Sequence, residues 1–107
     1  MSPDIILIRV HGTAAGYLIR EGSQFTVRYL PSYAGSSISL ALPVRNKPYV
    51  FSGLPPFFDG LLPEGVGLEG LLRTRKLDRD DWMGQLLAVG QDVPGSVTLE
   101  ATDEDAE

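Results

Sequence analysis

The order of apolar and polar residues divides the chain into two halves of different character. In the first half, residues 5–10 form an apolar run that ends at a His-Gly pair, and residues 16–20 form a second run that ends at a Glu-Gly pair. Both pairs are turn signals, because glycine adopts a positive φ without strain. The two runs therefore predict strands that are joined to their neighbours by tight turns.

Two further segments alternate strictly between apolar and polar side chains. They are residues 24–29 and residues 37–42. The apolar faces consist of Phe25, Val27 and Tyr29 in the first segment and of Ile38, Leu40 and Leu42 in the second. A period of two is typical of a strand with one buried face. We therefore expect four strands in the first half, joined by turns rather than by helices.

The second half is richer in proline, glycine and helical spacing. Residues 43–56 predict an irregular surface loop. A short helix is expected to start at Pro55 or Pro56, to present phenylalanine and leucine on one face, and to stop at Pro63. Leucines at positions 68, 71 and 72 indicate one or two further helical turns, although three interspersed glycines weaken that pattern.

A third helix and a last strand complete the pattern. Asp78 or Asp80 is the expected N-cap of the helix, and Gly90 is its expected C′ residue. Residues 95–100 alternate again and predict a strand. The resulting fold class is α+β: a small antiparallel, partly barrel-like sheet of about five strands, packed with two to three short helices. We expect this domain to span residues 1–100, followed by an acidic flexible tail at residues 101–107.

Length and composition narrow the class of protein. The chain of 107 residues is the size of one domain. No apolar stretch reaches the roughly 18 residues that span a bilayer, and the first residues lack a signal-peptide pattern, so we expect a soluble, cytoplasmic protein. The absence of cysteine excludes disulfides, zinc-thiolate sites and thiol catalysis. A net charge of −5 opposes direct binding to nucleic acid.

Residues that could carry catalysis are scarce. The single histidine, His11, falls in a predicted turn with no serine or carboxylate close in sequence. Glycines at 65, 67 and 70 match the spacing of a dinucleotide loop, but no strand precedes them. Asp59 and Glu64 could form an acid–base pair, yet nothing places a substrate between them. We therefore expect no catalytic activity, no cofactor and no metal site.

Three segments, in order along the chain, resemble the N-terminal domain of the HipA-type kinases. They are Ser-Leu-Ala-Leu-Pro at residues 39–43, Phe-Phe-Asp-Gly-Leu-Leu-Pro-Glu at residues 57–64, and Gly-Gln-Asp-Val-Pro-Gly-Ser-Val at residues 90–97. HipA-type toxins are longer serine/threonine kinases whose catalytic elements follow this module. The resemblance therefore implies the module without the kinase, and essentially the whole chain is covered.

The resemblance also implies partners and a role. Split systems of this family contain a stand-alone module called HipS, a shortened kinase called HipT, and a helix-turn-helix repressor called HipB. By that comparison the chain is expected to act as an antitoxin that binds a HipT- or HipA-type kinase and inhibits it. Two alternatives stay open: a truncated regulatory module of a full-length HipA kinase, and a co-regulator that acts through a HipB-type repressor.

Five residues are candidates for contact with such a partner. They are Trp82, Met83, Asp59, Glu64 and Asp92. Trp82 is the leading candidate, because a lone tryptophan beside Met83 and after an acidic run dominates an interface when it is exposed. The alternative is that Trp82 lies in the core, as tryptophans on amphipathic helices commonly do. The sequence leaves this choice open.

Overall fold

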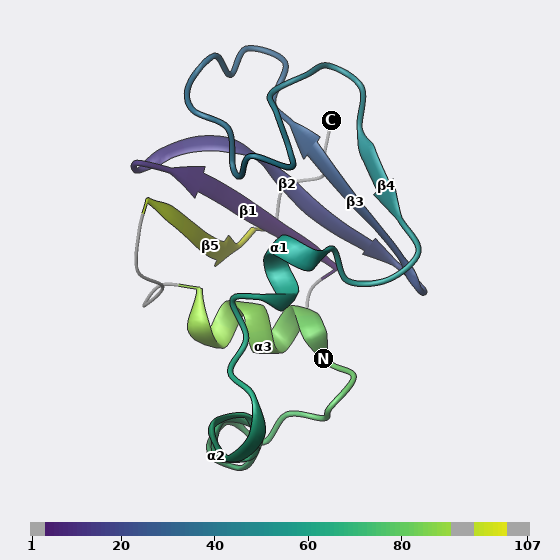
Figure 1. Cartoon of the computed structure of the whole chain (residues 1–107), viewed down its shortest axis with the longest axis vertical. Coiled ribbons are helices and arrows are strands. Elements are labelled where there is room, and N and C mark those ends of the chain that lie inside the picture. The colour runs from purple at the N-terminus through teal and green to yellow at the C-terminus, as the bar shows by residue number, and fades with distance from the viewer. Residues whose placement is uncertain (1–3, 91–95, 103–107) are drawn as a thin grey trace.

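Five antiparallel strands form one sheet in the computed structural model; the first and third helices cover one of its faces, and the second helix packs against the third (Figure 1). The structure describes residues 4–90 and 96–102. In chain order the elements are β1 (Ile5–Val10), β2 (Thr13–Glu21), β3 (Gln24–Tyr29), β4 (Tyr49–Phe51), α1 (Pro56–Asp59), α2 (Gly65–Arg75), α3 (Trp82–Val89) and β5 (Val97–Ala101). The predicted α+β class is therefore confirmed.

The strand order is β4-β3-β2-β1-β5, and every neighbouring pair is antiparallel. The first three strands follow one another as a meander, whereas β5 returns from the end of the chain to pair with β1. Because β4 and β5 are edge strands that do not meet, the sheet is open. The sequence had indicated a partly barrel-like sheet; the described strands do not close into a barrel.

The core lies between the sheet and the helices. Alternate residues of β1 and β3 point into it, and Ile6 of β1, Leu18 of β2 and Val27 of β3 form one fully buried row across the sheet. Leu86 of α3 and Phe58 of α1 cover this row from the helical side and are also fully buried. Since burial of an aliphatic or aromatic side chain contributes about 1.5–3 kcal/mol, this layer carries much of the fold's stability.

Helix α3 begins one to three residues later than the sequence indicated. Its N-cap is Asp81, not Asp78 or Asp80, and the Asp81 Oδ1 atom accepts a hydrogen bond of 3.0 Å from the backbone N–H of Gly84. Gly90 ends the helix with φ −63°, which is not the left-handed conformation expected of a C′ glycine. Instead, α3 meets β5 here: a Cβ atom on Gly90 would lie 2.6 Å from the Cβ atom of Leu99. Close packing explains this glycine.

Residues 37–42 do not form the expected strand. Ile38 and Leu42 are buried as predicted, but Leu40 is fully exposed, with a relative accessibility of 101%. The segment is a tight turn in which the backbone N–H of Leu42 donates to the carbonyl of Ser39 at 3.1 Å. A turn that buries its two ends gives the same alternation as a strand, so periodicity could not separate the two.

The hydroxyl of Tyr29 holds both sides of this turn. It accepts a hydrogen bond of 2.8 Å from the backbone N–H of Ile38 and donates to the carbonyl of Leu42. Burial raises the pKa of Tyr29 above its ordinary value, so the phenol keeps the proton that it donates. The turn is therefore anchored to β3 at a buried point.

Other boundaries shift by a few residues. Strand β2 starts three residues before the predicted run at residue 16, and β4 lies inside the segment expected to be a loop. Helix α1 starts at Pro56 as expected and ends at Asp59, while single-turn hydrogen bonds continue to Leu62. Helix α2 spans 11 residues despite its glycines. Within residues 4–90 and 96–102, no helix has the length and apolar character required to cross a membrane.

Candidate functional site

A groove lies between the α1–α2 connection and the start of α3. Its volume is about 380 Å³. It is bounded by the α1–α2 connection, the α2–α3 connection and the first turns of α2 and α3. The groove is lined by Asp59, Gly60, Leu62, Pro63, Glu64, Gly65, Leu68, Arg79, Trp82 and Gln85. It brings together three of the five residues that the sequence analysis selected, namely Asp59, Glu64 and Trp82.

Trp82 contributes both to the core and to the groove. Its ring is half-buried and meets the ring of Phe25 in an edge-to-face arrangement, with 6.0 Å between centroids and 62° between planes. The guanidinium of Arg20 lies over the same indole, 5.3 Å from the ring centroid. Such contacts fix the orientation of the indole. Trp82 therefore packs in part against the core, and the rest of its surface lines the groove, while its contact with a partner stays a prediction.

The wall of the groove formed by the α2–α3 loop is held by a buried amide. The side chain of Gln85 is 2% exposed, and its Nε2 atom donates two hydrogen bonds of 2.9 Å, to the carbonyls of Asp78 and Arg79. Arg20 of β2 adds a hydrogen bond of 3.2 Å to the carbonyl of Asp80. Because a buried amide with satisfied bonds is costly to displace, this loop has a defined position relative to α3 and the sheet.

The groove is lined by both polar and apolar groups. Leu62, Pro63 and Trp82 are half-buried and supply apolar surface, while Asp59 and Glu64 are exposed. The cation in the lining, Arg79, pairs with Glu69 of α2. A surface that combines apolar side chains with carboxylates is suited to binding a protein segment that carries an apolar side chain and a basic group.

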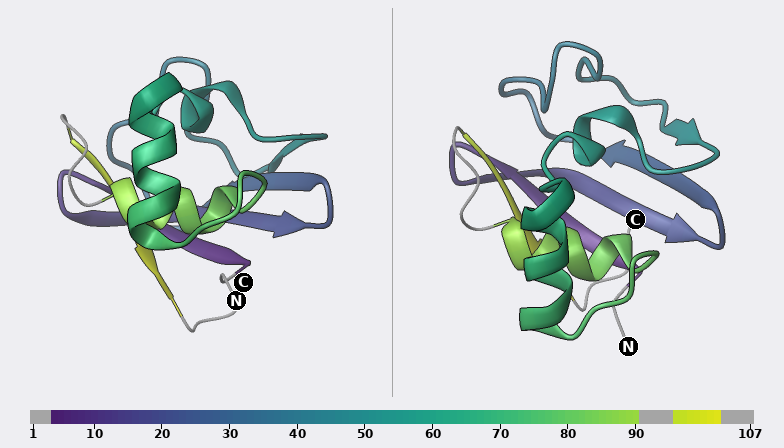
Figure 2. Two further views of the ribbon diagram at one scale, coloured as in Figure 1. Left: turned by 90° about the horizontal axis from the view of Figure 1, so that it is seen from below. Right: turned by 60° about the horizontal axis from the view of Figure 1, so that its bottom comes forward.

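Helix α2 stands away from the body of the molecule. Figure 2 shows it projecting beyond α3, and only Leu72 of this helix is buried among its 11 residues. Val66, in its first turn and adjacent to the groove residue Gly65, is 89% exposed. An exposed valine next to an apolar groove extends the surface available to a partner.

The remaining sequence candidates lie elsewhere. Met83 is 1% exposed and belongs to the core, since it lies on the side of α3 that faces the sheet. It therefore offers no surface to a partner in this structure. Asp92 lies outside the described residues. Sequence reasoning did not select Arg79, Gln85 or Val66, because the features that mark them, namely an ion pair, a buried amide and an unpacked helix face, arise only on folding.

The part of the chain that the structure describes holds no group of three or more His, Cys, Asp or Glu residues placed to bind a metal ion. His11 has φ 51° in the β1–β2 turn and is exposed, away from the residues that line the groove.

The open five-stranded sheet, covered on one face by α1 and α3 with α2 against α3, is the fold of a HipA N-terminal domain. The chain belongs to the HipA N-terminal domain family, whose model matches residues 6–100. A HipA N-terminal domain is a non-catalytic domain. A solved structure described as the N-terminal domain of HipA toxin has the same fold, with a TM-score of 0.71 and 24% identity over 94% of each chain.

A relative of similar size occurs in Haemophilus influenzae. It is described as an uncharacterized protein and is 29% identical to this chain over 91 residues. The match covers 85% of this chain and 86% of the relative. The relative is therefore of similar length to this chain.

Proposed function

We propose that the protein is an antitoxin-like binding protein that associates with a HipT- or HipA-type serine/threonine kinase and holds it inactive. Membership of the HipA N-terminal domain family supports this choice of partner. The observation that carries the binding role is the groove, which gathers Asp59, Glu64 and Trp82 into one surface beside the exposed Val66.

The groove and the first turn of α2 form the proposed kinase-binding surface. The apolar and charged side chains that line this surface are both found in standard protein interfaces. Gln85 already holds the α2–α3 loop by two hydrogen bonds. The loop therefore loses little conformational entropy when a partner binds, which favours affinity. Inhibition follows either from obstruction of the kinase active site or from restraint of its ATP-binding lobe.

The test uses the purified chain and a purified HipT- or HipA-type kinase. Val66→Asp and Glu64→Arg each change an exposed side chain on the proposed surface, so the fold should be retained. We expect each to raise the Kd for the kinase at least about tenfold, which corresponds to about 1.4 kcal/mol. Each should also relieve inhibition of ATP consumption by the kinase. The matched control is Val50→Asp on β4, where the valine is 61% exposed.

Two outcomes would contradict the proposal. One is inhibition by Val66→Asp and Glu64→Arg at wild-type strength. The other is binding of the chain to a HipB-type repressor with no affinity for the kinase, which would favour the role of a co-regulator.

A further inference from the structure

Arg20 of β2 connects parts of the molecule that lie far apart in the sequence. Its Nε atom donates a hydrogen bond of 2.9 Å to the carbonyl of Gly22 in the β2–β3 turn, and its Nη1 atom donates to the carbonyl of Asp80 in the α2–α3 loop. Its guanidinium lies 5.3 Å from the ring centroid of Trp82 and 5.6 Å from that of Phe25. A single planar group therefore contacts a turn, a loop and two aromatic rings.

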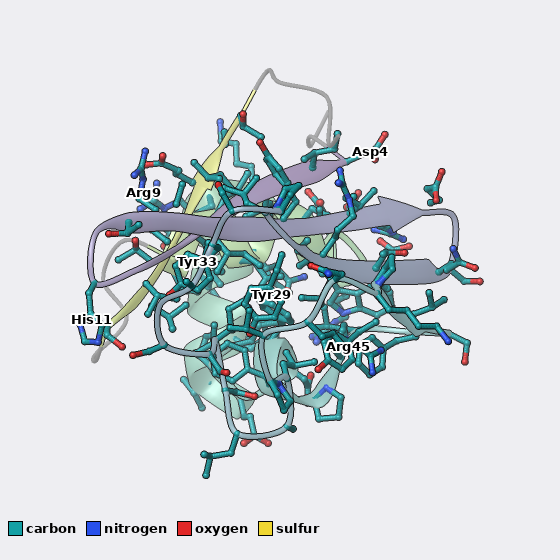
Figure 3. The ribbon with its side chains drawn as sticks, turned by 90° about the horizontal axis from the view of Figure 1, so that it is seen from above. Asp4, Arg9, His11, Tyr29, Tyr33 and Arg45 are labelled. Atoms are coloured by element: carbon teal, nitrogen blue, oxygen red, sulfur yellow. The ribbon has the colours of Figure 1, made fainter. Side chains whose placement is uncertain are left out.

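The backbone places Arg20 at the end of the sheet that lies beside the start of α3. Its N–H donates to the carbonyl of Asp4 at 2.8 Å, and its partner residue in β3 is Phe25. Figure 3 shows Asp4 and His11 at opposite ends of β1. Because alternate residues of a strand share a face, Arg20 points to the same side as the buried Leu18. Its side chain thus reaches from the sheet towards the helices.

Arg20 and Gln85 together hold three successive carbonyls of the α2–α3 loop, those of residues 78–80. Gln85 binds the first two, and Arg20 binds the third. Because the two side chains come from different elements, α3 and β2, the loop is fixed from two sides. Arg79 of this loop and Trp82 both line the groove, whereas Arg20 does not. Arg20 therefore acts on two walls of the groove from outside it.

We propose that Arg20 is a positioning residue of the kinase-binding surface: it sets the indole of Trp82 and the α2–α3 loop in the geometry that the kinase recognises. The inference rests on the proposed function. A guanidinium suits this task because its N–H groups diverge in one plane, while the face of that plane stacks on aromatic rings. A lysine at position 20 would keep the charge and lose this fork. The arginine is therefore needed for its shape and not only for its charge.

The fluorescence of Trp82 tests the positioning in the chain alone. Trp82 is the sole tryptophan of the sequence, so the quenching of its emission by acrylamide reports on this indole. Arg20→Gln removes the guanidinium and both of its hydrogen bonds. It should raise the quenching constant above that of wild type, because the ring face that the guanidinium covers becomes accessible, and Arg20→Lys should do the same. Wild-type quenching in either variant would overturn the proposal.

Arg45 offers a matched control, on the loop that leads to β4 (Figure 3). Its guanidinium also lies over an aromatic ring, 3.5 Å from the centroid of Tyr49. Its Nε and Nη2 atoms donate to the carbonyls two and three residues further along the chain, at 2.8 and 3.1 Å. Arg45→Gln removes the same kinds of contact outside the groove. It should leave the quenching of Trp82 and the affinity for the kinase unchanged.

Affinity for the kinase tests the consequence. Calorimetric titration of a purified HipT- or HipA-type kinase, at a temperature where every variant is folded, should give a Kd at least about fivefold higher for Arg20→Gln and for Arg20→Lys than for wild type. In a Trp82→Leu background, Arg20→Gln should raise the Kd by a smaller factor, because one of the groups that Arg20 positions is gone. Equal factors in both backgrounds would show that Arg20 does not act through Trp82 and would contradict the proposal.

The two measurements separate this inference from the proposed function. A wild-type chain that does not bind the kinase contradicts the proposed function, and increased quenching in Arg20→Gln then still supports the positioning of Trp82. If wild type binds and both Arg20 variants bind equally well, the proposed function stands and the inference fails. A rise in quenching in Arg45→Gln as large as that in Arg20→Gln would also refute it, because any loss of a stacked arginine would then loosen the indole.

Discussion

One substitution, glycine to alanine, should have opposite effects at two helical positions of this protein. Gly70 in α2 and Gly90 at the end of α3 both lack a positive φ. In a helix, alanine is favoured over glycine by about 1 kcal/mol. If propensity alone acted, both variants would be more stable than wild type.

The surroundings of the two glycines reverse this expectation at one of them. A Cβ atom on Gly70 would have nothing within 4 Å. On Gly90 it would lie 2.6 Å from the Cβ atom of Leu99 and 2.8 Å from the carbonyl oxygen of Leu86. The backbone N–H of Leu99 also donates to the carbonyl of Gly90 at 3.1 Å, so β5 cannot move away without cost. Overpacking costs about 1–3 kcal/mol, and more where backbone atoms must shift.

Equilibrium unfolding in urea measures both effects. With a slope of about 1 kcal/mol per M for a chain of this size, Gly90→Ala should lower the midpoint by about 1–2 M. Gly70→Ala should raise the midpoint by up to about 1 M. Gly90→Asn separates packing from capping, because asparagine is tolerated at a left-handed cap but not at a close approach. A Gly90→Ala midpoint at or above that of wild type would refute the packing argument.

Three further substitutions address the turn, the cap and the indole. Tyr29→Phe should lower the free energy of unfolding by about 1–3 kcal/mol, because the N–H of Ile38 and the carbonyl of Leu42 lose their buried partner; amide exchange at Ile38 checks this. Since folding raises the pKa of Tyr29, the contribution of Tyr29 to stability should be constant below about pH 10 and fall as the pH rises further. The melting temperature of Tyr29→Phe should fall less than that of wild type between about pH 9 and about pH 11. Asp81→Ala should cost about 1 kcal/mol through loss of the N-cap, and an unchanged melting temperature would contradict this. Trp82→Ala should cost about 1–3 kcal/mol, less than for a fully buried tryptophan, and an unchanged stability would show that its core contacts are unimportant.

Strands β1 and β3 could be predicted from the sequence to the residue, because the apolar run of β1 and the alternation of β3 begin and end with the strands. The start of β2 was predicted three residues too late. Strand β4 was missed, since three residues in a proline-rich segment carry no pattern. The turn around Leu40 was mistaken for a strand, because a buried hydroxyl on Tyr29, and not a sheet ladder, satisfies its backbone.

The candidate site could be predicted only in part. Residue types indicated Asp59, Glu64 and Trp82, but no spacing rule shows that positions 59, 64 and 82 share one groove. They come together because the chain leaves the groove along α2 and comes back to it at the turn formed by Asp78–Asp81. The buried side chain of Gln85 fixes this turn by two hydrogen bonds. Interactions of that kind, between a loop and a helix that follows it, are decided by tertiary packing.

The pairing of β1 with β5 has a consequence for synthesis of the chain. Ile8 is opposite Leu99 in the sheet, and Arg9 forms an ion pair with Glu100, 91 residues away, at 2.9 Å. A ribosome must therefore translate almost the entire domain before β1 obtains its second neighbour. Contacts between such distant residues slow folding, and until they form β1 presents an unpaired, aliphatic edge. Nascent chains stopped before β5 should consequently aggregate, even though they contain four of the five described strands and all three described helices.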